Sequence, residues 1–234
     1  MKFHVLGKGF IYSKHAEAIK AVGGVEVDSY DEADYIVILT PSYLHYEQTM
    51  EALDKGKKVI VEKPLALSSR ECQKIEVAGK SRVFPIMQMR YLFGGFGLNR
   101  KKLNLQWNNI EIRVRVYRDE NFFESWKGDE EKSGGILLNL GIHYIDLVTH
   151  IFGQPTAWVN GIFEGVDYAC HYEFSYDASK NSQVRLFRIN GREYNLETKE
   201  NLHIKAYRDI INNKLIPISE ICNLVKLIEQ LKSL

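Results

Sequence analysis

Three polar side chains interrupt an apolar segment in the second half of the chain. Asn139 and His143 are four residues apart and His143 and Asp146 three apart, so a helix would present them on one face. A histidine titrates near neutral pH and can take a proton from a hydroxyl, and a neighbouring carboxylate can orient its ring. The alternative is a structural histidine in an apolar helix. The presence of all three groups favours general-base chemistry.

A lysine follows an apolar run in the first half of the chain. Glu62, Lys63 and Pro64 lie at the end of the strand-like segment Lys58–Glu62. The carboxyl ends of parallel strands are where open α/β sheets bind ligands. A lysine at that place can orient and polarise a hydroxyl or carbonyl oxygen. The alternative is a surface lysine in a turn that Pro64 holds.

Two glycines near the N-terminus are typical of a dinucleotide site. Gly7 and Gly9 follow the strand-like segment Lys2–Leu6 and precede a helical pattern, where a pyrophosphate binds at a helix N-terminus. Tyr12 stands where a complete GxGxxG would have its third glycine, and a plain tight turn is the alternative. Asp28 follows about 20 residues after the glycines, where a ribose-binding acid is expected. Its alternative is a turn residue at the end of a strand.

Strand-like and helical segments alternate in the first half of the chain, and they must position these residues. The alternation predicts βαβ units and a parallel sheet. The expected strands are Lys2–Leu6, Val25–Asp28, Tyr35–Thr40, Lys58–Glu62 and Val83–Met89, and the expected helices are Ser13–Val22, Tyr46–Leu53 and Ser68–Ala78. Only six residues separate Asp28 from Tyr35, too few for the helix and strand that usually follow. We therefore expect a Rossmann-like sheet that is truncated after its second strand.

The second half predicts a mostly antiparallel, open-faced sheet with helices. Alternating segments indicate half-exposed strands, and Asn190-Gly191 signals a hairpin turn. The expected strands are Ile110–Tyr117, Tyr168–Tyr176, Gln183–Ile189 and Arg192–Leu196, with helices at Gly135–Phe152 and, broken near Pro217, at about Asn201–Leu234. Gly94, Gly95 and Gly97 mark a junction near residue 95. The fold class is thus α/β plus α+β, with domains at 1–92 and 93–234.

Composition excludes several classes of protein. The 234 residues are 45% hydrophobic and 26% charged, which suits a folded globular chain rather than a disordered one. The formal net charge is +1, without the basic excess of nucleic-acid-binding proteins. Three scattered cysteines argue against a disulfide framework or a zinc site, so no metal is expected. No apolar run approaches the roughly 18–20 residues of a membrane span, and the expected location is the cytoplasm.

Two of these motifs together resemble a known family. Glu62-Lys63-Pro64 and the pattern GGxxxNxGxHxxD from Gly134 to Asp146 are similar to markers of the glucose–fructose oxidoreductase, inositol dehydrogenase and MocA family of nicotinamide-dependent dehydrogenases. Asn139 stands where many members carry Asp, and this resembles the branch that oxidises UDP-N-acetylglucosaminuronic acid at C3. The segments GFIYSKHAEAIK, PSYLH, QMRY and SWKGDEEKSGG point to the same branch.

The resemblance implies roles for individual residues. Lys63 and His143 would be catalytic, with His143 as the general base and Lys63 favouring the developing alkoxide. The cofactor-binding candidates are Gly7, Gly9, Phe10 and Ile11 at the pyrophosphate, Asp28 at the ribose, Thr40, Pro41 and His45 toward the nicotinamide ribose, and Glu62 and Lys63 beside the nicotinamide. The substrate-binding candidates are Asn139, His143, Arg90, Trp126, Lys127 and Tyr207. For Tyr207, and for His203 near it, a structural role is the favoured alternative.

The expected function is oxidation of a nucleotide sugar by NAD, with NADP less favoured because Asp28 would repel a 2′-phosphate. Two alternatives remain open. One is a dehydrogenase of the same family that acts on another sugar or polyol. The other is a shortened, non-catalytic protein that binds a dinucleotide or a partner. The expected partners are the nucleotide-sugar substrate and further copies of the chain, as a homodimer or homotetramer through the C-terminal sheet, with neither nucleic acid nor membrane.

Overall fold

The computed structural model describes residues 1–92, 107–177 and 179–233, which form two compact units. The first comprises Met1–Gln88 and Glu200–Lys226, and the second Met89–Lys199 and Leu227–Leu234. The sequence placed all of 93–234 in one domain, whereas Glu200–Lys226 groups with the N-terminal residues. The physical reason is that the helix Leu202–Ile211 packs against the helix Tyr12–Ala21. In addition, Asn201 Nδ2 donates to the Lys14 carbonyl over 2.8 Å. The expected junction near residue 95 lies outside the described residues.

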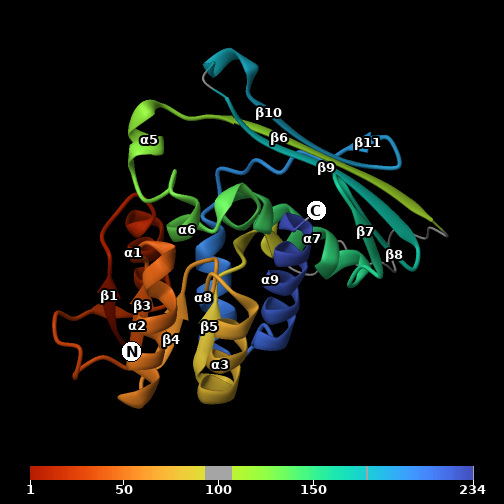
Figure 1. Ribbon diagram of the computed structural model, residues 1–234. Helices are drawn as coiled ribbons and strands as arrows, with labels where there is room; N and C mark the ends of the chain where they lie inside the picture. The colour runs from red at the N-terminus through yellow and green to blue at the C-terminus, as the bar shows by residue number, and fades with distance from the viewer. Residues whose placement is uncertain (93–106, 178, 234) are drawn as a thin grey trace. The chain divides into compact units, whose positions relative to one another are not determined.

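The first unit contains a parallel sheet of five strands in the order β2-β1-β3-β4-β5 (Figure 1). The strands are β1 (Lys2–Leu6), β2 (Val25–Glu26), β3 (Tyr35–Ile38), β4 (Lys58–Val61) and β5 (Val83–Pro85). Every residue of β3 is buried, as expected for a strand covered on both faces. The sheet confirms the predicted Rossmann-like class, and it ends at β2 on one side, as the short segment after Asp28 indicates.

Four helices accompany this sheet. They are α1 (Tyr12–Ala21), α2 (His45–Asp54), α3 (Ser69–Gly79) and α8 (Leu202–Ile211), with 3₁₀ turns at Ser42–Leu44 and Lys80–Arg82. Helix α1 packs against α8, and α2 packs against α3. Helix α3 begins with a capping box in which Ser68 and Glu71 satisfy each other's backbone N–H groups. The last helix, α9 (Ile218–Lys232), begins just after Pro217, where the sequence predicts the break.

The second unit contains a six-stranded sheet in the order β11-β10-β6-β9-β8-β7. Its strands are β6 (Asn108–Tyr117), β7 (Ala157–Val159), β8 (Ile162–Gly165), β9 (Tyr168–Asp177), β10 (Val184–Ile189) and β11 (Arg192–Glu193). Only β6 and β9 pair in parallel, so the expectation of a mostly antiparallel sheet is confirmed. Asn190 and Gly191 form the hairpin turn between β10 and β11 with φ of +51° and +77°.

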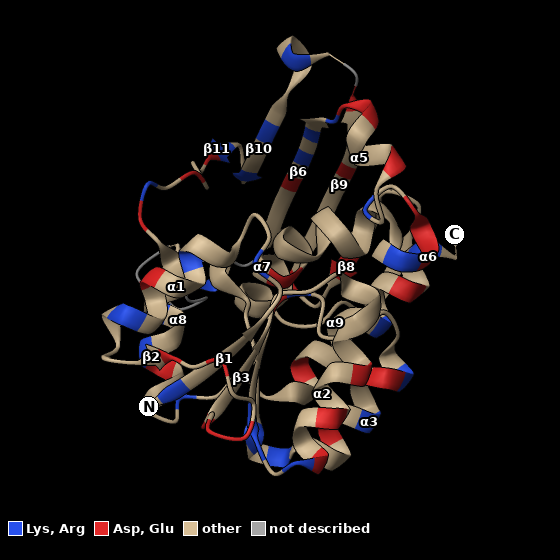
Figure 2. Cartoon of the chain, turned by 90° about the vertical axis from the view of Figure 1, so that its left-hand side faces the viewer, with Lys and Arg blue, Asp and Glu red and all other residues tan. Residues whose placement is uncertain are grey.

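The two faces of this sheet differ in chemistry. On β6, Ile110, Ile112, Val114 and Val116 are at most 1% exposed. The opposite face carries a row of ion pairs. Glu111 pairs with Arg113 and Arg188, and Glu173 pairs with Arg113 and Arg115, with N–O distances of 3.2–3.4 Å. Figure 2 shows these basic and acidic positions on β6, β9 and β10. The face of this sheet opposite the buried aliphatic residues of β6 is therefore charged on these strands rather than apolar.

Short helical segments complete the second unit. They are a 3₁₀ turn at Gln88–Tyr91, α5 (Glu120–Glu124), α6 (Glu130–Ser133), a π-helical turn at Leu137–Gly141, α7 (Ile142–Phe152) and a 3₁₀ turn at Lys180–Ser182. Among the described residues, the stretch Glu130–Phe152 is apolar and long enough to cross a membrane, which the sequence reading did not anticipate. Because 61% of its apolar window is buried, the stretch has the character of a core helix.

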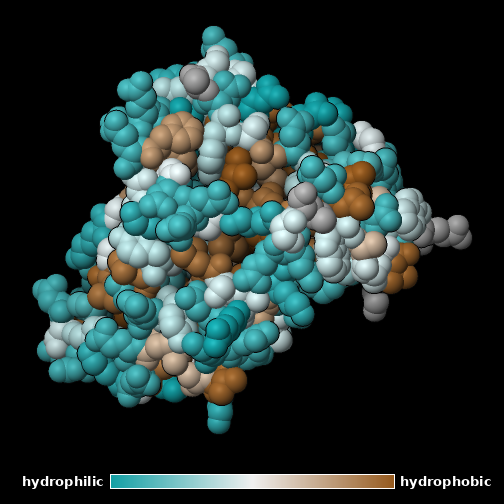
Figure 3. Space-filling model, viewed as in Figure 1, coloured by the Kyte–Doolittle hydropathy of each residue, from teal (hydrophilic) through white to brown (hydrophobic). Residues whose placement is uncertain are grey.

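Hydrophilic residues cover most of the molecular face that Figure 3 shows, which is the face seen in Figure 1.

A buried ion pair joins two of these segments. The Arg90 guanidinium donates to both carboxylate oxygens of Asp146 on α7, with Nε–Oδ2 at 2.9 Å and Nη2–Oδ1 at 2.6 Å. Both side chains are at most 5% exposed. A buried pair of this kind is tolerated because each charge satisfies the other.

We predict that Arg90→Met destabilises the protein by about 3–5 kcal/mol, because Asp146 then keeps a buried charge without this cation. The double variant Arg90→Met/Asp146→Leu should recover most of that loss, since it removes both charges. Denaturant unfolding at neutral pH measures both values. A loss below about 1 kcal/mol in Arg90→Met would show that the pair is not structural.

Candidate active site

The glycine turn between β1 and α1 has a backbone that only glycine adopts easily. Gly7 has φ of +91°, and a Cβ atom there would lie 2.9 Å from the backbone of Leu39 and Thr40. A Cβ on Gly9 would meet nothing within 4 Å, so the turn is open on that side. Ile11, the N-cap of α1, makes no side-chain cap, and Phe10 is 94% exposed. The N-terminal end of α1 and the open space beside Gly9 suit a pyrophosphate.

Three side chains next to this turn form a cluster that the sequence did not reveal. Lys8 Nζ lies 2.7 Å from Glu26 Oε1, and the Tyr12 hydroxyl donates to Glu26 Oε2 over 2.8 Å. Burial opposes the ionisation of Glu26, but the hydrogen bonds from Lys8 and Tyr12 outweigh it and lower the pKa of Glu26. Asp28, the predicted ribose ligand, is exposed and lies close enough for its charge to act on Lys8. The Tyr12 that replaces the third glycine therefore serves to hold a carboxylate.

A buried histidine joins the carboxyl ends of β3 and β4. His45 is 1% exposed, with Nδ1 at 2.7 Å from the Pro64 carbonyl and Nε2 at 2.9 Å from the Thr40 carbonyl. The Thr40 hydroxyl donates to Gln48 over 2.6 Å, and Pro41 begins the 3₁₀ turn Ser42–Leu44. His45 thus holds two loops at the edge of the sheet. Its predicted contact with the cofactor, and those of Thr40 and Pro41, stay predictions.

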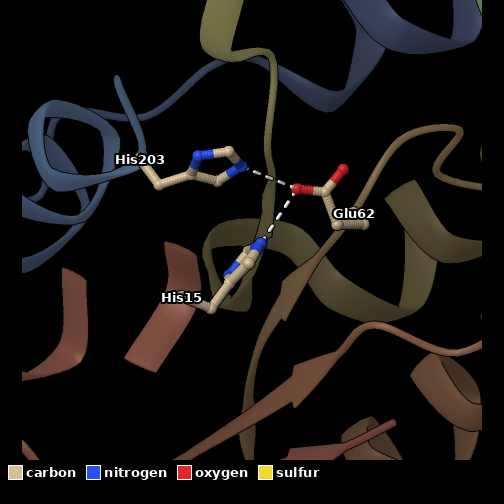
Figure 4. Close-up of side chains that lie close together, drawn as sticks. All are labelled: His15, Glu62 and His203. Carbon is tan, nitrogen blue, oxygen red and sulfur yellow. Dashed lines mark hydrogen bonds and ion pairs between the residues drawn. The ribbon is translucent and has the colours of Figure 1, made fainter. Parts of the chain in front are cut away.

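Glu62 lies at the centre of a hydrogen-bonded cluster in the first unit (Figure 4). Its Oε1 accepts from His15 Nε2 of α1 over 2.9 Å and from His203 Nε2 of α8 over 3.0 Å. Burial would raise the pKa of Glu62, but the hydrogen bonds from His15 and His203 outweigh burial and hold the pKa well below its usual range. The other oxygen, Oε2, accepts from the backbone N–H of Lys63 over 3.2 Å.

This cluster explains two of the sequence candidates. The Oε1 atom of Glu62 is engaged by two imidazoles, and the predicted place of Glu62 beside the nicotinamide stays a prediction. Tyr207, a candidate for the substrate pocket, is fully buried, and its hydroxyl lies 2.9 Å from His15 Nδ1. That position supports the structural alternative for Tyr207. His15 was present in the segment GFIYSKHAEAIK, but nothing in its spacing from Glu62 indicated the contact, because the two residues meet only through the fold.

In the second unit, the predicted polar face begins in a π-helical turn rather than an α-helix. Asn139 lies within Leu137–Gly141, and His143 is the second residue of α7. Such π-turns are frequent at functional sites. Both side chains are half-buried, whereas Asp146, which was expected to orient His143, is engaged by Arg90. Because Arg90 is buried and bound to Asp146, its position favours the structural alternative over contact with a substrate carboxylate.

Tyr176 on β9 is a neighbour of Asn139 and packs in turn on Phe122 of α5. Burial raises the pKa of Tyr176, and a hydrogen bond with Asn139 counters part of that effect. The Tyr176 ring lies 5.0 Å from Phe122, and the Arg118 guanidinium lies 4.8 Å from the Phe122 centroid. Alternation on β9 placed aromatic residues on one face but did not single out Tyr176 as a neighbour of Asn139.

The candidates Trp126 and Lys127 lie in the loop after α5. Lys127 Nζ lies 5.8 Å from the Trp126 ring, and both side chains are half-buried. A Cβ on Gly128 would come within 2.4 Å of the Phe123 carbonyl oxygen, so this loop folds tightly back on α5. Their roles as substrate ligands stay predictions.

Comparison with known proteins agrees with this two-part architecture. Residues 25–83 match the oxidoreductase family model with an NAD-binding Rossmann fold, and residues 108–164 match the C-terminal alpha/beta domain of the same family. The chain is 27% identical over 194 residues to the scyllo-inositol 2-dehydrogenase (NADP(+)) IolW of Bacillus subtilis, which covers 77% of this chain and 54% of that protein. It is 29% identical over 156 residues to the glucose-6-phosphate 3-dehydrogenase of the same organism, covering 61% and 45%. The chain thus spans about half the length of these curated relatives.

Solved structures show the same fold. The WlbA (WbpB) dehydrogenase of Thermus thermophilus, in complex with NAD and UDP-GlcNAcA, superposes with a TM-score of 0.86 at 23% identity, covering 100% of this chain and 95% of that one. The WlbA dehydrogenase of Bordetella pertussis gives 0.77 at 17% identity, covering 99% and 95%. The expectation of NAD as cofactor is confirmed at the level of the family, whose N-terminal domain is NAD-binding. Both domain models of the GFO_IDH_MocA oxidoreductase family thus match this chain, in the expected order, over residues 25–83 and 108–164.

Proposed function

We propose that the protein is an NAD-dependent dehydrogenase that oxidises a hydroxyl of a sugar or polyol. The observation that carries this proposal is the place of Lys63. It follows β4 at the carboxyl edge of the parallel sheet, the same edge at which β1 ends in the glycine turn. Open α/β sheets bind their ligands at this edge. A cation there, anchored through its neighbour Glu62, is suited to stabilise an oxygen that gains negative charge.

The cofactor site is formed by residues of the first unit. Gly7, Gly9 and the start of α1 would hold the pyrophosphate, and the strained turn beside open space fits that role. When bound, NAD supplies the acceptor for the hydride, and the protein supplies binding and orientation. Lys63 would favour the alkoxide form of the reacting hydroxyl, and His143 would remove its proton.

For the substrate we propose a nucleotide sugar, UDP-N-acetylglucosaminuronic acid, oxidised at C3 in the cytoplasm. Asn139 in place of the commoner aspartate supports this choice, as does the loop with Trp126 and Lys127. Two WlbA dehydrogenases of similar fold were solved with UDP-GlcNAcA. The curated relatives act on inositol or glucose 6-phosphate by name, which favours another sugar or polyol as the second candidate. The truncated sheet favours the non-catalytic alternative. Cofactor titration combined with NAD reduction on a panel of sugars and polyols separates it from both enzymes.

The role of His143 is tested by His143→Asn, which keeps a similar volume but removes the base. Turnover with NAD and the UDP-sugar should fall by about 10²–10⁴-fold, the usual contribution of a general base. NADH binding and the melting temperature should change little, because the glycine turn belongs to the other unit. Fluorescence titration, thermal melting and NAD reduction on one preparation measure all three. Full activity in a folded His143→Asn protein would end the assignment.

Cofactor choice is tested by comparing dissociation constants for NADH and NADPH. The protein should bind NADH more tightly, because the exposed Asp28 carboxylate repels a 2′-phosphate. In Asp28→Asn, the difference between the dissociation constants for NADH and NADPH should be smaller. Glu26→Gln, the matched control, should narrow it less, because Lys8 already offsets the Glu26 charge. Equal or tighter binding of NADPH by the unaltered protein would contradict this prediction.

We also propose a homodimer or homotetramer through the C-terminal sheet. The charged face of β6 and β9 carries both signs side by side, so two copies can exchange the partners of Glu173 and Arg113 across a two-fold axis. Light scattering at micromolar concentration should show an oligomer, and Glu173→Arg should shift it toward the monomer. A monomeric unaltered protein at that concentration would refute the proposal.

A further inference from the structure

The two ring nitrogens of His203 both face oxygen atoms that can only accept. Nε2 lies 3.0 Å from Glu62 Oε1, and Nδ1 lies 3.2 Å from Asn201 Oδ1. The orientation of the Asn201 amide is fixed, because its Nδ2 donates to the Lys14 carbonyl over 2.8 Å and to Glu17 Oε2 over 2.9 Å. Its Oδ1 therefore points to His203. A neutral imidazole has one N–H and can satisfy only one of these two acceptors.

His15 has a different set of partners, although it lies beside His203 with ring centroids 4.6 Å apart. Its Nε2 lies 2.9 Å from Glu62 Oε1, but its Nδ1 lies 2.9 Å from the Tyr207 hydroxyl, which can donate. A neutral ring with its proton on Nε2 satisfies both contacts. Burial lowers the pKa of His15, which agrees with the neutral form.

We infer that His203 is doubly protonated and forms a buried ion pair with Glu62, and that this pair is a positioning device for Lys63. Glu62 Oε1 accepts from the charged His203 and from the neutral His15, and Glu62 Oε2 accepts from the backbone N–H of Lys63. Among the described residues, the charged and titratable groups that face His203 include Glu62, which directly follows β4, His15 on α1 and, through Asn201, Glu17 on α1. The statement about charge is independent of the proposed function, whereas the statement about Lys63 rests on it.

A proton accounts for the geometry better than a bound metal. His15, Glu62 and His203 together offer two imidazoles and a carboxylate, a donor set that could hold a divalent ion. Ligand atoms around a tetrahedral zinc, with bonds of about 2.0–2.1 Å, lie roughly 3.3 Å from one another. The separations of 2.9 and 3.0 Å from Glu62 Oε1 are shorter than that and are those of N–H···O hydrogen bonds.

The pair predicts that removal of one partner is worse than removal of both. His203→Gln keeps a donor to Glu62 but removes the positive charge, so a buried carboxylate remains without its counter-ion. We expect the melting temperature to fall by on the order of 10 °C. His203→Gln/Glu62→Gln removes both charges and should recover at least half of the fall. His15→Gln, the matched control, replaces a neutral donor and should lower the melting temperature less than His203→Gln.

The pH profile of activity distinguishes a role of His203 in positioning Lys63 from a role in stability alone. Without the charge of His203, the pKa of Glu62 should rise, so NAD-dependent oxidation by His203→Gln should gain a new acidic limb in its pH profile. The limb should be absent from the unaltered protein, from His15→Gln and from the double variant, in which Glu62 no longer titrates. A parallel fall at every pH in His203→Gln would overturn the positioning role.

Nitrogen NMR of the histidine rings tests the charge without reference to activity. At neutral pH, the His203 ring should show both nitrogens protonated. Because His45 also places both ring nitrogens on acceptors, the His203 signals are assigned by their loss in His203→Gln. His15 should show the neutral form with its proton on Nε2. A neutral His203 would overturn the inference, and so would stoichiometric zinc in the purified protein that accounts for the same contacts. Absence of any dehydrogenase activity would refute the proposed function while leaving the NMR and melting results to decide the ion pair.

Discussion

The buried carboxylate of Glu62 is the constraint on which the first unit depends. An ionised carboxylate that is 8% exposed is costly unless it is paired and hydrogen-bonded. The donors come from two helices that lie far apart in sequence, His15 on α1 and His203 on α8. The low pKa of Glu62 means that its contribution to stability is present at neutral pH and is lost as pH falls through that value. The edge of the sheet, helix α1 and helix α8 are therefore linked through one atom, Glu62 Oε1.

This constraint also accounts for the path of the chain. Residues 200–226 follow the whole second sheet, yet they pack with the N-terminal residues. Helix α8 supplies one of the two imidazoles that donate to Glu62 Oε1, and without it only His15 would donate to that oxygen. The same arrangement compensates for a short sheet. With β2 at the edge and no further strand beyond it, the region next to the glycine turn is closed by Lys8, Tyr12 and Glu26.

Local pattern predicted much of this fold. The apolar run of β3, the alternation of β6 and the Asn190-Gly191 turn each carry their own signal, because burial and turn geometry act over a few residues. The catalytic candidates Lys63 and His143 were found by type and spacing. The π-helical turn around Asn139, the pairing of Arg90 with Asp146 and the contact of His203 with Glu62 were not. Each depends on groups that only the folded chain brings together, so no period or motif in the sequence reports them.

The measurement that tests the account most directly is NADH formation from NAD and UDP-N-acetylglucosaminuronic acid, compared between Lys63→Ala and Lys58→Ala. Lys58 begins the same strand, at the far end from the candidate site. The unaltered protein and Lys58→Ala should form NADH, whereas Lys63→Ala should bind NADH but turn over at least about 100-fold more slowly. Full turnover in Lys63→Ala would contradict the account. So would an unaltered protein that binds NADH and oxidises neither this sugar nor any member of a panel of sugars and polyols.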